Sequence, residues 1–320
     1  MHSKAILAAS IAITGLLADS SCASATAYTF TTLDVSGAAN TRAFGINDLG
    51  QIVGFFNTST EGHGFLYFGG SFTSIDPPGA FGRSGANGIN DAGEIVGSSN
   101  TGQGHGFLRG ADGSFTSIDV PGASGFGTFA SGINGRGQIV GTYFTSPGEL
   151  PNQHGFLRDA DGSFTTIDAP AAFSTDARGI NGAGDIVGDF ENGTGGHGFL
   201  RYAGGNIITL DVPGASATDA LGINDAGQIV GDFLLGTRIH GLVRDTDGNF
   251  ATLDVPGASS TEAWGINDAG QIVGVFGDGT GADHGFLATP VSPVPEPSGL
   301  VVVGLGLIGL IAMRRRQRTQ

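Results

Sequence analysis

Apolar and polar positions along the chain recur in blocks, and no stretch of the body follows a convincing helical period. The triplet Gly-Ile-Asn begins at six places, with spacings of 43, 44, 47, 43 and 43 residues. Its first residues are Gly45, Gly88, Gly132, Gly179, Gly222 and Gly265. Self-similarity at this period is typical of a solenoid, a propeller or another repeat array.

Each block contains four short pieces rich in Ile, Val, Phe and Thr, the composition of β-strands. The patterns of the pieces are Ala-x-Gly-Ile-Asn (Ala263–Asn267), Gln-Ile-Val-Gly (Gln271–Phe276), His-Gly-Phe-Leu-Arg (His154–Arg158) and an alternating piece (Ser163–Ala169). Asn or Asp followed by Gly separates the first piece from the second and the third from the fourth. These residues favour tight hairpin turns, so the block predicts four antiparallel strands.

The two ends of the repeat region complement each other. The first piece, Phe30–Val35, is a fourth strand with no partners before it, and the last, His284–Ala288, is a third strand with none after it. The first piece therefore completes the last block. We predict an all-β, six-bladed β-propeller of four-stranded blades whose ring is closed by Phe30–Val35. An open β-repeat array is the alternative.

Length variation is confined to the links between the second and third strands and between blocks. In an up-and-down sheet these links lie on the same face, and scaffolds often carry function on variable loops. The longest such link, Thr142–Gln153, carries Tyr143 and Phe144. We expect any specific site on this face.

Both tails resemble targeting segments rather than parts of the fold. Residues 1–27 have the charged start, apolar run and small-residue end of a secretory signal peptide. They include Cys22, the only cysteine, where lipidation is the alternative to removal with the signal. The body, 28–290, is followed by a linker, 291–298, a short transmembrane helix, 299–313, and a basic cytoplasmic tail, 314–320.

The charge balance limits the partners of the body. The chain has 14 basic and 29 acidic residues, and removing the five basic and two acidic residues of the tails leaves nine against 27. Such an acidic body argues against nucleic acid and anionic membranes as partners. We therefore expect contact with a membrane only through the C-terminal helix before processing.

One histidine opens the third strand of every block, and hairpin folding brings each histidine close to an aspartate. We interpret these pairs as structural braces; a metal ring or a catalytic histidine is the alternative. The pairs are His63 with Asp76, His105 with Asp119, His154 with Asp168, His197 with Asp211, His240 with Asp254, and His284 with Asp34.

One position in the first strand differs between blocks where its neighbours do not. It holds Phe44, Asn87, Ser131, Arg178, Leu221 and Trp264. Aromatic rings stack on sugars, and Arg and Asn bind hydroxyls, so Phe44, Asn87, Arg178 and Trp264, with Tyr143, are candidate ligand-binding residues. Mere tolerance of substitution is the alternative.

Cofactor and catalytic signals are weak. The turns Asp159–Gly162 and Asp245–Gly248 resemble the start of a calcium loop but lack its later ligands, so calcium is weakly supported and no other cofactor or metal is expected. No asymmetric cluster of nucleophile, base and orienting group is present. An enzyme would need two acids near the axis, such as Asp176 and Glu262.

Two resemblances follow from these motifs. Gly-Ile-Asn-Asp-x-Gly-Gln-Ile-Val-Gly followed by His-Gly-Phe-Leu resembles the bacterial extracellular HAF repeat family over residues 30–288, with His-Gly-Phe where the family has His-Ala-Phe. The sequence Val294, Pro295, Glu296 and Pro297, the short apolar segment and the arginine cluster resemble the PEP-CTERM sorting signal.

The sorting resemblance implies export through the inner membrane of a Gram-negative bacterium, transient anchoring, and cutting by an exosortase-type protease before release to the cell surface or beyond. Such proteins are associated with exopolysaccharide and biofilm, and the repeat family implies no established enzymatic activity. We therefore predict a secreted, surface-sorted, non-enzymatic repeat protein that is associated with or binds extracellular polysaccharide or biofilm matrix. A propeller glycan hydrolase or lyase and a purely structural matrix component are the alternatives.

Overall fold

The computed structural model describes residues 26–80, 82–100, 104–124, 126–145 and 152–291. These residues form 24 β-strands and no helix, so the all-β prediction is confirmed. In the first half of the chain the strands are β1 (Tyr28–Leu33), β2 (Asn40–Ile46), β3 (Ile52–Asn57), β4 (Gly62–Phe68), β5 (Ser71–Ile75), β6 (Ser84–Ile89), β7 (Ile95–Asn100), β8 (Gly104–Arg109), β9 (Phe115–Ile118), β10 (Thr128–Ile133), β11 (Ile139–Phe144) and β12 (Gln153–Arg158).

The second half continues the same succession of short strands. They are β13 (Phe164–Ile167), β14 (Ser174–Ile180), β15 (Ile186–Asn192), β16 (Gly195–Arg201), β17 (Ile207–Leu210), β18 (Ala217–Ile223), β19 (Ile229–Leu235), β20 (Arg238–Arg244), β21 (Phe250–Leu253), β22 (Ser260–Ile266), β23 (Ile272–Gly277) and β24 (Asp283–Pro290).

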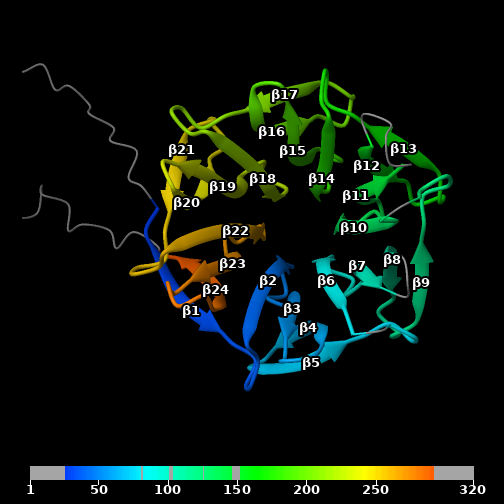
Figure 1. Ribbon diagram of the computed structural model, residues 1–320, viewed down its shortest axis with the longest axis horizontal. Helices are drawn as coiled ribbons and strands as arrows, with labels where there is room; N and C mark the ends of the chain where they lie inside the picture. The colour runs from blue at the N-terminus through cyan, green and yellow to red at the C-terminus, as the bar shows by residue number, and fades with distance from the viewer. Residues whose placement is uncertain (1–25, 81, 101–103, 125, 146–151, 292–320) are drawn as a thin grey trace, which may run out of the picture.

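Consecutive strands pair antiparallel in groups of four, such as β2-β3-β4-β5 and β6-β7-β8-β9. The last group is β22-β23-β24-β1, in which the first strand of the chain pairs with the last one. Figure 1 shows the groups following one another around a common centre, with strands such as β2, β10 and β18 innermost and β5, β9 and β13 outermost. Strands from opposite ends of the sequence therefore share one sheet.

The strand ends differ slightly from the predicted ones. In the last repeat the innermost strand begins at Ser260 and stops at Ile266, one residue before the predicted end. The side chain of Asn267 explains the stop, because its Oδ1 accepts the backbone N–H of Gln271 at 2.9 Å and closes the turn. The outer strand β13 is shorter than predicted, which leaves Asp168 beyond its end.

The turn asparagines also connect neighbouring groups. The Nδ2 of each donates to the backbone carbonyl of the next asparagine, at 3.0 to 3.4 Å. The series runs through Asn47, Asn90, Asn134, Asn181, Asn224 and Asn267, and Asn267 donates to the carbonyl of Asn47 at 3.2 Å. The series thus returns to its first residue, and all six side chains are buried.

The glycine of Gly-Ile-Asn is required by the closeness of neighbouring innermost strands. A Cβ added to Gly222 would lie 2.6 Å from the carbonyl oxygen of Trp264, and one added to Gly265 would lie 2.7 Å from that of Phe44. Real Cβ atoms do not approach backbone oxygens so closely, and only glycine lets backbones meet at this distance.

The glycine of Ile-Val-Gly has a different partner, the phenylalanine of His-Gly-Phe. A Cβ on Gly274 would lie 2.0 Å from the carbonyl oxygen of Glu262 and 2.7 Å from the ring of Phe286, which is fully buried. The pairing register shifts nearby, between Ala263 and Gly265. Ile-Val-Gly and His-Gly-Phe of a repeat therefore pack as one unit, in which the phenylalanine ring lies against the glycine backbone.

The predicted tails lie largely or wholly outside the described residues. This holds for residues 1–25 of the signal peptide, for most of the linker, for the predicted helix 299–313 and for the basic tail. Within the described part of the chain, no helix is long and apolar enough to cross a membrane.

A glycine substitution at the centre tests the close approach. Gly222→Ala should destabilise the protein by about 1–3 kcal/mol, because a Cβ has no space beside the Trp264 carbonyl. Urea unfolding followed by tryptophan fluorescence measures the effect. Gly85→Ala is the matched control in another innermost strand, where the nearest atom, Asn87 Oδ1, lies 3.5 Å away. Equal stability of the two variants would contradict this account.

Candidate functional site

A cavity of about 420 Å³ lies where the innermost strands meet. All six residues of the variable position line it, namely Phe44, Asn87, Ser131, Arg178, Leu221 and Trp264. Thr142, Phe144 and Gln153 complete part of the wall from β11 and β12, next to the longest variable link. The cavity therefore opens toward the face on which chain length varies.

Aromatic rings stand on two sides of the cavity. Phe44 and Trp264 contact each other with ring centroids 4.9 Å apart, and Trp264 Nε1 donates to Glu262 Oε2 at 3.1 Å. Phe129 and Phe144 form an edge-to-face pair with centroids 6.0 Å apart. The strand of Trp264, β22, and the strand of Phe129, β10, lie on opposite sides of the centre in Figure 1. The cavity thus has two separate aromatic walls.

Among the described residues that line the cavity, Arg178 alone has a cationic side chain. Its Nε donates to Asp189 Oδ1 at 2.9 Å, and its Nη2 lies 3.4 Å from Asp176 Oδ2. Burial alone would lower the pKa of Arg178, but the two carboxylates raise it above its usual range. Asp176 also accepts bonds from Thr142 and, at 2.5 Å, from Gln153. The guanidinium is therefore already paired.

Three further acids accompany this ion pair, and within the described residues no salt bridge joins them to a cation. Asp219 and Asp232 face each other across β18 and β19, and Glu262 follows on β22. Burial, then the charge of Asp189, raises the pKa of Asp219 to about 7. Burial, then the charges of Asp219 and Glu262, raises the pKa of Asp232 to about 8. One side of the centre is therefore crowded with carboxyl groups.

This acidic cluster is the feature that the sequence reasoning missed as a group. Its innermost members stand three residues before the Gly of Gly-Ile-Asn, where the last three repeats have Asp176, Asp219 and Glu262. The first three repeats have Arg42, Gly85 and Phe129 at this position. A comparison of this column, in addition to the neighbouring variable one, would have revealed the asymmetry.

Tyr143 is the candidate ligand residue that the structure does not bring to the cavity. It lies buried under His154, with stacked rings 5.1 Å apart, and its hydroxyl is 2.9 Å from Thr166 Oγ1. Side chains alternate along a strand, so its neighbour Phe144 faces the cavity in its place.

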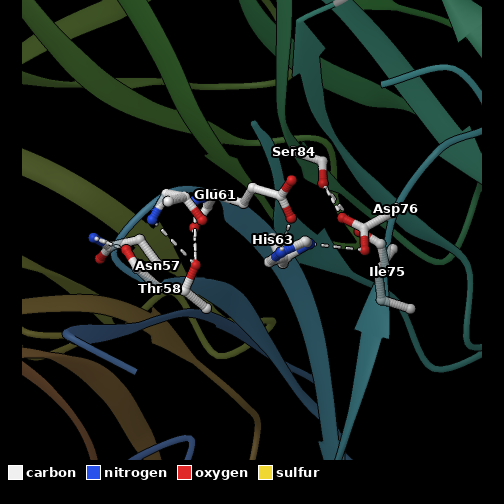
Figure 2. A network of polar contacts seen from close by, with 8 residues as sticks. Asn57, Thr58, Glu61, His63, Ile75, Asp76 and Ser84 are labelled. Carbon is white, nitrogen blue, oxygen red and sulfur yellow. Dashed lines mark hydrogen bonds and ion pairs between the residues drawn. The ribbon is translucent and has the colours of Figure 1, made fainter. Parts of the chain in front are cut away.

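The six histidines lie against the aspartates that the hairpin register predicts. Each Nδ1 is 2.8 to 3.0 Å from a carboxylate oxygen, in pairs that run from His63 and Asp76 to His284 and Asp34. Figure 2 shows His63 between Asp76 and Glu61. The pair of His284 and Asp34 connects β24 with the end of β1, and hydrogen bonding to Asp34 raises the pKa of His284.

A second bond ties the end of each outer strand to the next innermost strand. Thr175 Oγ1, for example, accepts the backbone N–H of Ala169 at 3.1 Å, and Thr218 does the same for Val212. At the junction after β5 the corresponding residue is Pro77, which has no backbone N–H and cannot make this bond. There Ser84 replaces threonine and donates to Asp76, as Figure 2 shows. The histidine pairs and these hydroxyls thus meet at the same junctions.

The two turns that resemble calcium loops use their acids locally. Asp161 Oδ1 accepts bonds from the backbone and hydroxyl of Ser163, which lower the pKa of Asp161. Asp245 accepts bonds from Asn249, which lower its pKa in the same way. Across the residues that the structure describes, no group of three or more His, Cys, Asp or Glu side chains is arranged to hold a metal ion.

Comparison with known proteins identifies the tail and the fold. Residues 293–316 match the PEP-CTERM protein-sorting motif. No curated protein matches the chain. Among solved structures, regucalcin, a calcium-binding protein from Agrobacterium tumefaciens, is 15% identical with a TM-score of 0.52, covering 84% of this chain and 97% of that one.

Two further structures have the same TM-score of 0.52. The β-propeller domain of the Trilobed protease from Pyrococcus furiosus is 12% identical and covers 81% of this chain and 86% of that one. A gluconolactonase from Xanthomonas campestris is 13% identical, with 82% and 90% covered. At these identities the likeness defines the fold alone, and the protein belongs to the class of β-propellers.

The sorting motif then specifies what kind of β-propeller protein this is. A PEP-CTERM tail is a substrate signal for exosortase processing in Gram-negative bacteria. The protein is therefore exported and sorted to the cell surface or the extracellular space.

The buried carboxyl groups predict an inverse dependence of stability on pH. The folded chain holds the proton of Asp232 up to a pKa of about 8, against an ordinary 3.8, so stability falls as pH rises between these values. In Asp232→Asn this loss is absent. Relative to wild type, the variant should gain at least about 1 kcal/mol between pH 5 and pH 9.

Thermal unfolding at both pH values measures this gain. Asp247→Asn, which removes an exposed carboxylate from the turn between β20 and β21, is the control. A gain of the same size in the control would show that overall net charge, and not the buried site, is responsible.

Proposed function

We propose that the protein is a non-enzymatic, surface-sorted propeller that binds extracellular polysaccharide in its central cavity. The observation that carries this proposal is the lining of the cavity. In a body built from near-identical repeats, six different side chains meet there, and they combine aromatic walls with polar groups. A sugar ring binds to a flat aromatic surface through its apolar face and to nearby polar side chains through its hydroxyls, and this cavity offers both.

We further propose a closed ring of six four-stranded blades, built from repeats of the HAF type. Pairing of β1 with β24 supports the closure, as does the hydrogen bond from Asn267 to Asn47. Closure is relevant to function because it fixes Trp264 of the last repeat beside Phe44 of the first. A binding wall is thereby formed from residues 220 positions apart.

The proposed route to the surface includes transient anchoring by the segment 299–313. An exosortase-type protease would cut near the motif Val294, Pro295, Glu296 and Pro297. Release there separates the body from its anchor, which is consistent with an acidic surface that has no attraction for anionic membranes.

A glycan hydrolase or lyase is the second candidate, favoured by the raised pKa of Asp219 and Asp232, since such carboxyl groups can act as acids near neutral pH. Of the acids suggested by the sequence, Asp176 lines the cavity but is held by Arg178 and Gln153, while Glu262 accepts from Trp264. Release of reducing ends from a bound polysaccharide, lost in Asp219→Asn, would favour the enzyme. A structural component with no ligand would show neither binding nor release.

Trp264→Ala tests the binding site. Removal of the indole should weaken retention of extracellular polysaccharide at least about tenfold, or about 1.4 kcal/mol, because the indole supplies apolar contact area to the bound sugar. Affinity electrophoresis of the full chain through gels containing the polysaccharide measures retention. Tyr202→Ala, an exposed aromatic between β16 and β17, is the control, and unchanged retention in Trp264→Ala would refute the site.

Glu296→Gln tests the sorting step. Loss of the carboxylate from the Pro-Glu-Pro motif should leave the chain uncut and in the membrane fraction, whereas wild type should be shortened and released. Immunoblotting of cell fractions measures both forms. Glu262→Gln, in the body, is the control for charge loss, and normal processing of Glu296→Gln would refute the role assigned to the motif.

A further inference from the structure

We infer that the central cavity holds two neighbouring sugar rings of one polysaccharide chain, one on each aromatic wall, and rejects sugars that carry an anionic group. This inference rests on the proposed function and specifies its ligand. Two observations support it. The two aromatic walls lie on opposite sides of the cavity, and the cation between them, Arg178, is already paired with carboxylates.

The first wall is held in place before any ligand arrives. The indole of Trp264 is fixed on one edge by its bond to Glu262 and on one face by the ring of Phe44. Both aromatic side chains keep part of their surface exposed. A rigid, partly exposed ring loses little conformational entropy on binding, so this wall offers one preorganised stacking surface.

The second wall belongs to a different part of the chain. Phe129 and Phe144 line the cavity from β10 and β11, and Phe126 packs on Phe144 with centroids 5.4 Å apart. Phe126 is among the most exposed large apolar residues of the described chain, at 72%. Aromatic surface thus continues from the cavity onto the variable face, where a polysaccharide chain can leave the site.

Polar groups between the walls favour hydroxyls over anions. Asn87 uses one N–H on the carbonyl of Ala130 at 2.8 Å, which leaves its other amide hydrogen and its carbonyl oxygen for a ligand. Arg178 is paired with Asp189 and Asp176. A uronate would therefore meet a cation whose charge two carboxylates already balance, and it would gain little from pairing with that cation.

The remaining acids add to the rejection. Asp219, Asp232 and Glu262 have no neighbouring cation beyond the paired Arg178 within the described residues. Once Asp219 and Asp232 have lost their protons, above pH 8, their negative field opposes a carboxylate, sulfate or phosphate on the ligand, while hydroxyl and acetamido groups meet no such repulsion. The aromatic walls and the charges between them therefore both favour a polysaccharide without anionic groups.

The full chain should be tested for binding to an array of immobilised oligosaccharides of one to six rings, in neutral, amino-bearing and uronate-bearing series. Calorimetry in solution then measures the affinity for each series. We expect binding to members without anionic groups. Affinity should rise at least about tenfold from one ring to two and less than about threefold for each further ring.

Variants assign this binding to the two walls. Trp264→Ala and Phe129→Leu should each reduce the affinity for two rings to that for one, and Tyr202→Ala should change nothing. In the double variant Asp219→Asn with Asp232→Asn, uronate-bearing members should gain at least about threefold at pH 9, where both wild-type carboxyls are ionised, while neutral members stay the same.

The outcomes separate this inference from the proposed function. Preference for uronates, or affinity that keeps rising steeply beyond two rings, would overturn the inference, and if Trp264→Ala still weakened binding, the cavity would remain the site. Binding that is insensitive to both wall variants, or no binding to any member of the array, would overturn both proposals.

Discussion

The structure depends on how closely its innermost strands approach one another at the centre. Each asparagine of Gly-Ile-Asn donates to the next asparagine's carbonyl, and the series returns from Asn267 to Asn47. The same approach leaves no room for a Cβ at glycines such as Gly222. Each repeat must supply the same short donor and the same bare backbone, so the sequence has little freedom in this stretch. The near-identity of "GINDAGQIVG" and its relatives is thus a consequence of geometry at the centre.

This constraint also defines where the repeats can differ. The residue before each Gly-Ile-Asn contributes its carbonyl to the contact, but its side chain lines the cavity, where its neighbours differ from repeat to repeat. Trp264 and Leu221 can therefore occupy equivalent positions without disturbing the strands. The rim is similarly fixed, because the histidine pairs tie the end of each outer strand to its own group and the threonine hydroxyls tie it to the next group. The innermost turns and the rim are therefore both constrained, and sequence variation between repeats is concentrated in the cavity lining and on the face with variable loops.

Much of this arrangement could be predicted from the sequence because repetition turns single weak signals into a consistent pattern. The partners of His154 and Asp168 follow from hairpin register, and the strand order and the common location of the variable residues follow from the repeat of four strands around one centre. Tyr143 could not be placed in this way, since its orientation depends on where β11 starts to alternate, and the structure turns Phe144 inward instead. The position of Asp232 was missed for a related reason. The register shift between Ala220 and Gly222 sets Asp232 opposite Asp219, and this shift is visible only in the pairing of the strands.

The distribution of charge at the centre is difficult to explain as scaffold. The first three repeats form the same strands and the same asparagine bonds with Arg42, Gly85 and Phe129 where the last three have acids. Folding therefore does not require carboxyl groups there. Burying Asp219 and Asp232 beside one another opposes folding at neutral pH, as their raised pKa values indicate. A cost that half of the repeats avoid is typical of a functional site, and an acidic side facing two aromatic walls is the asymmetry that a binding site for one orientation of a sugar chain needs.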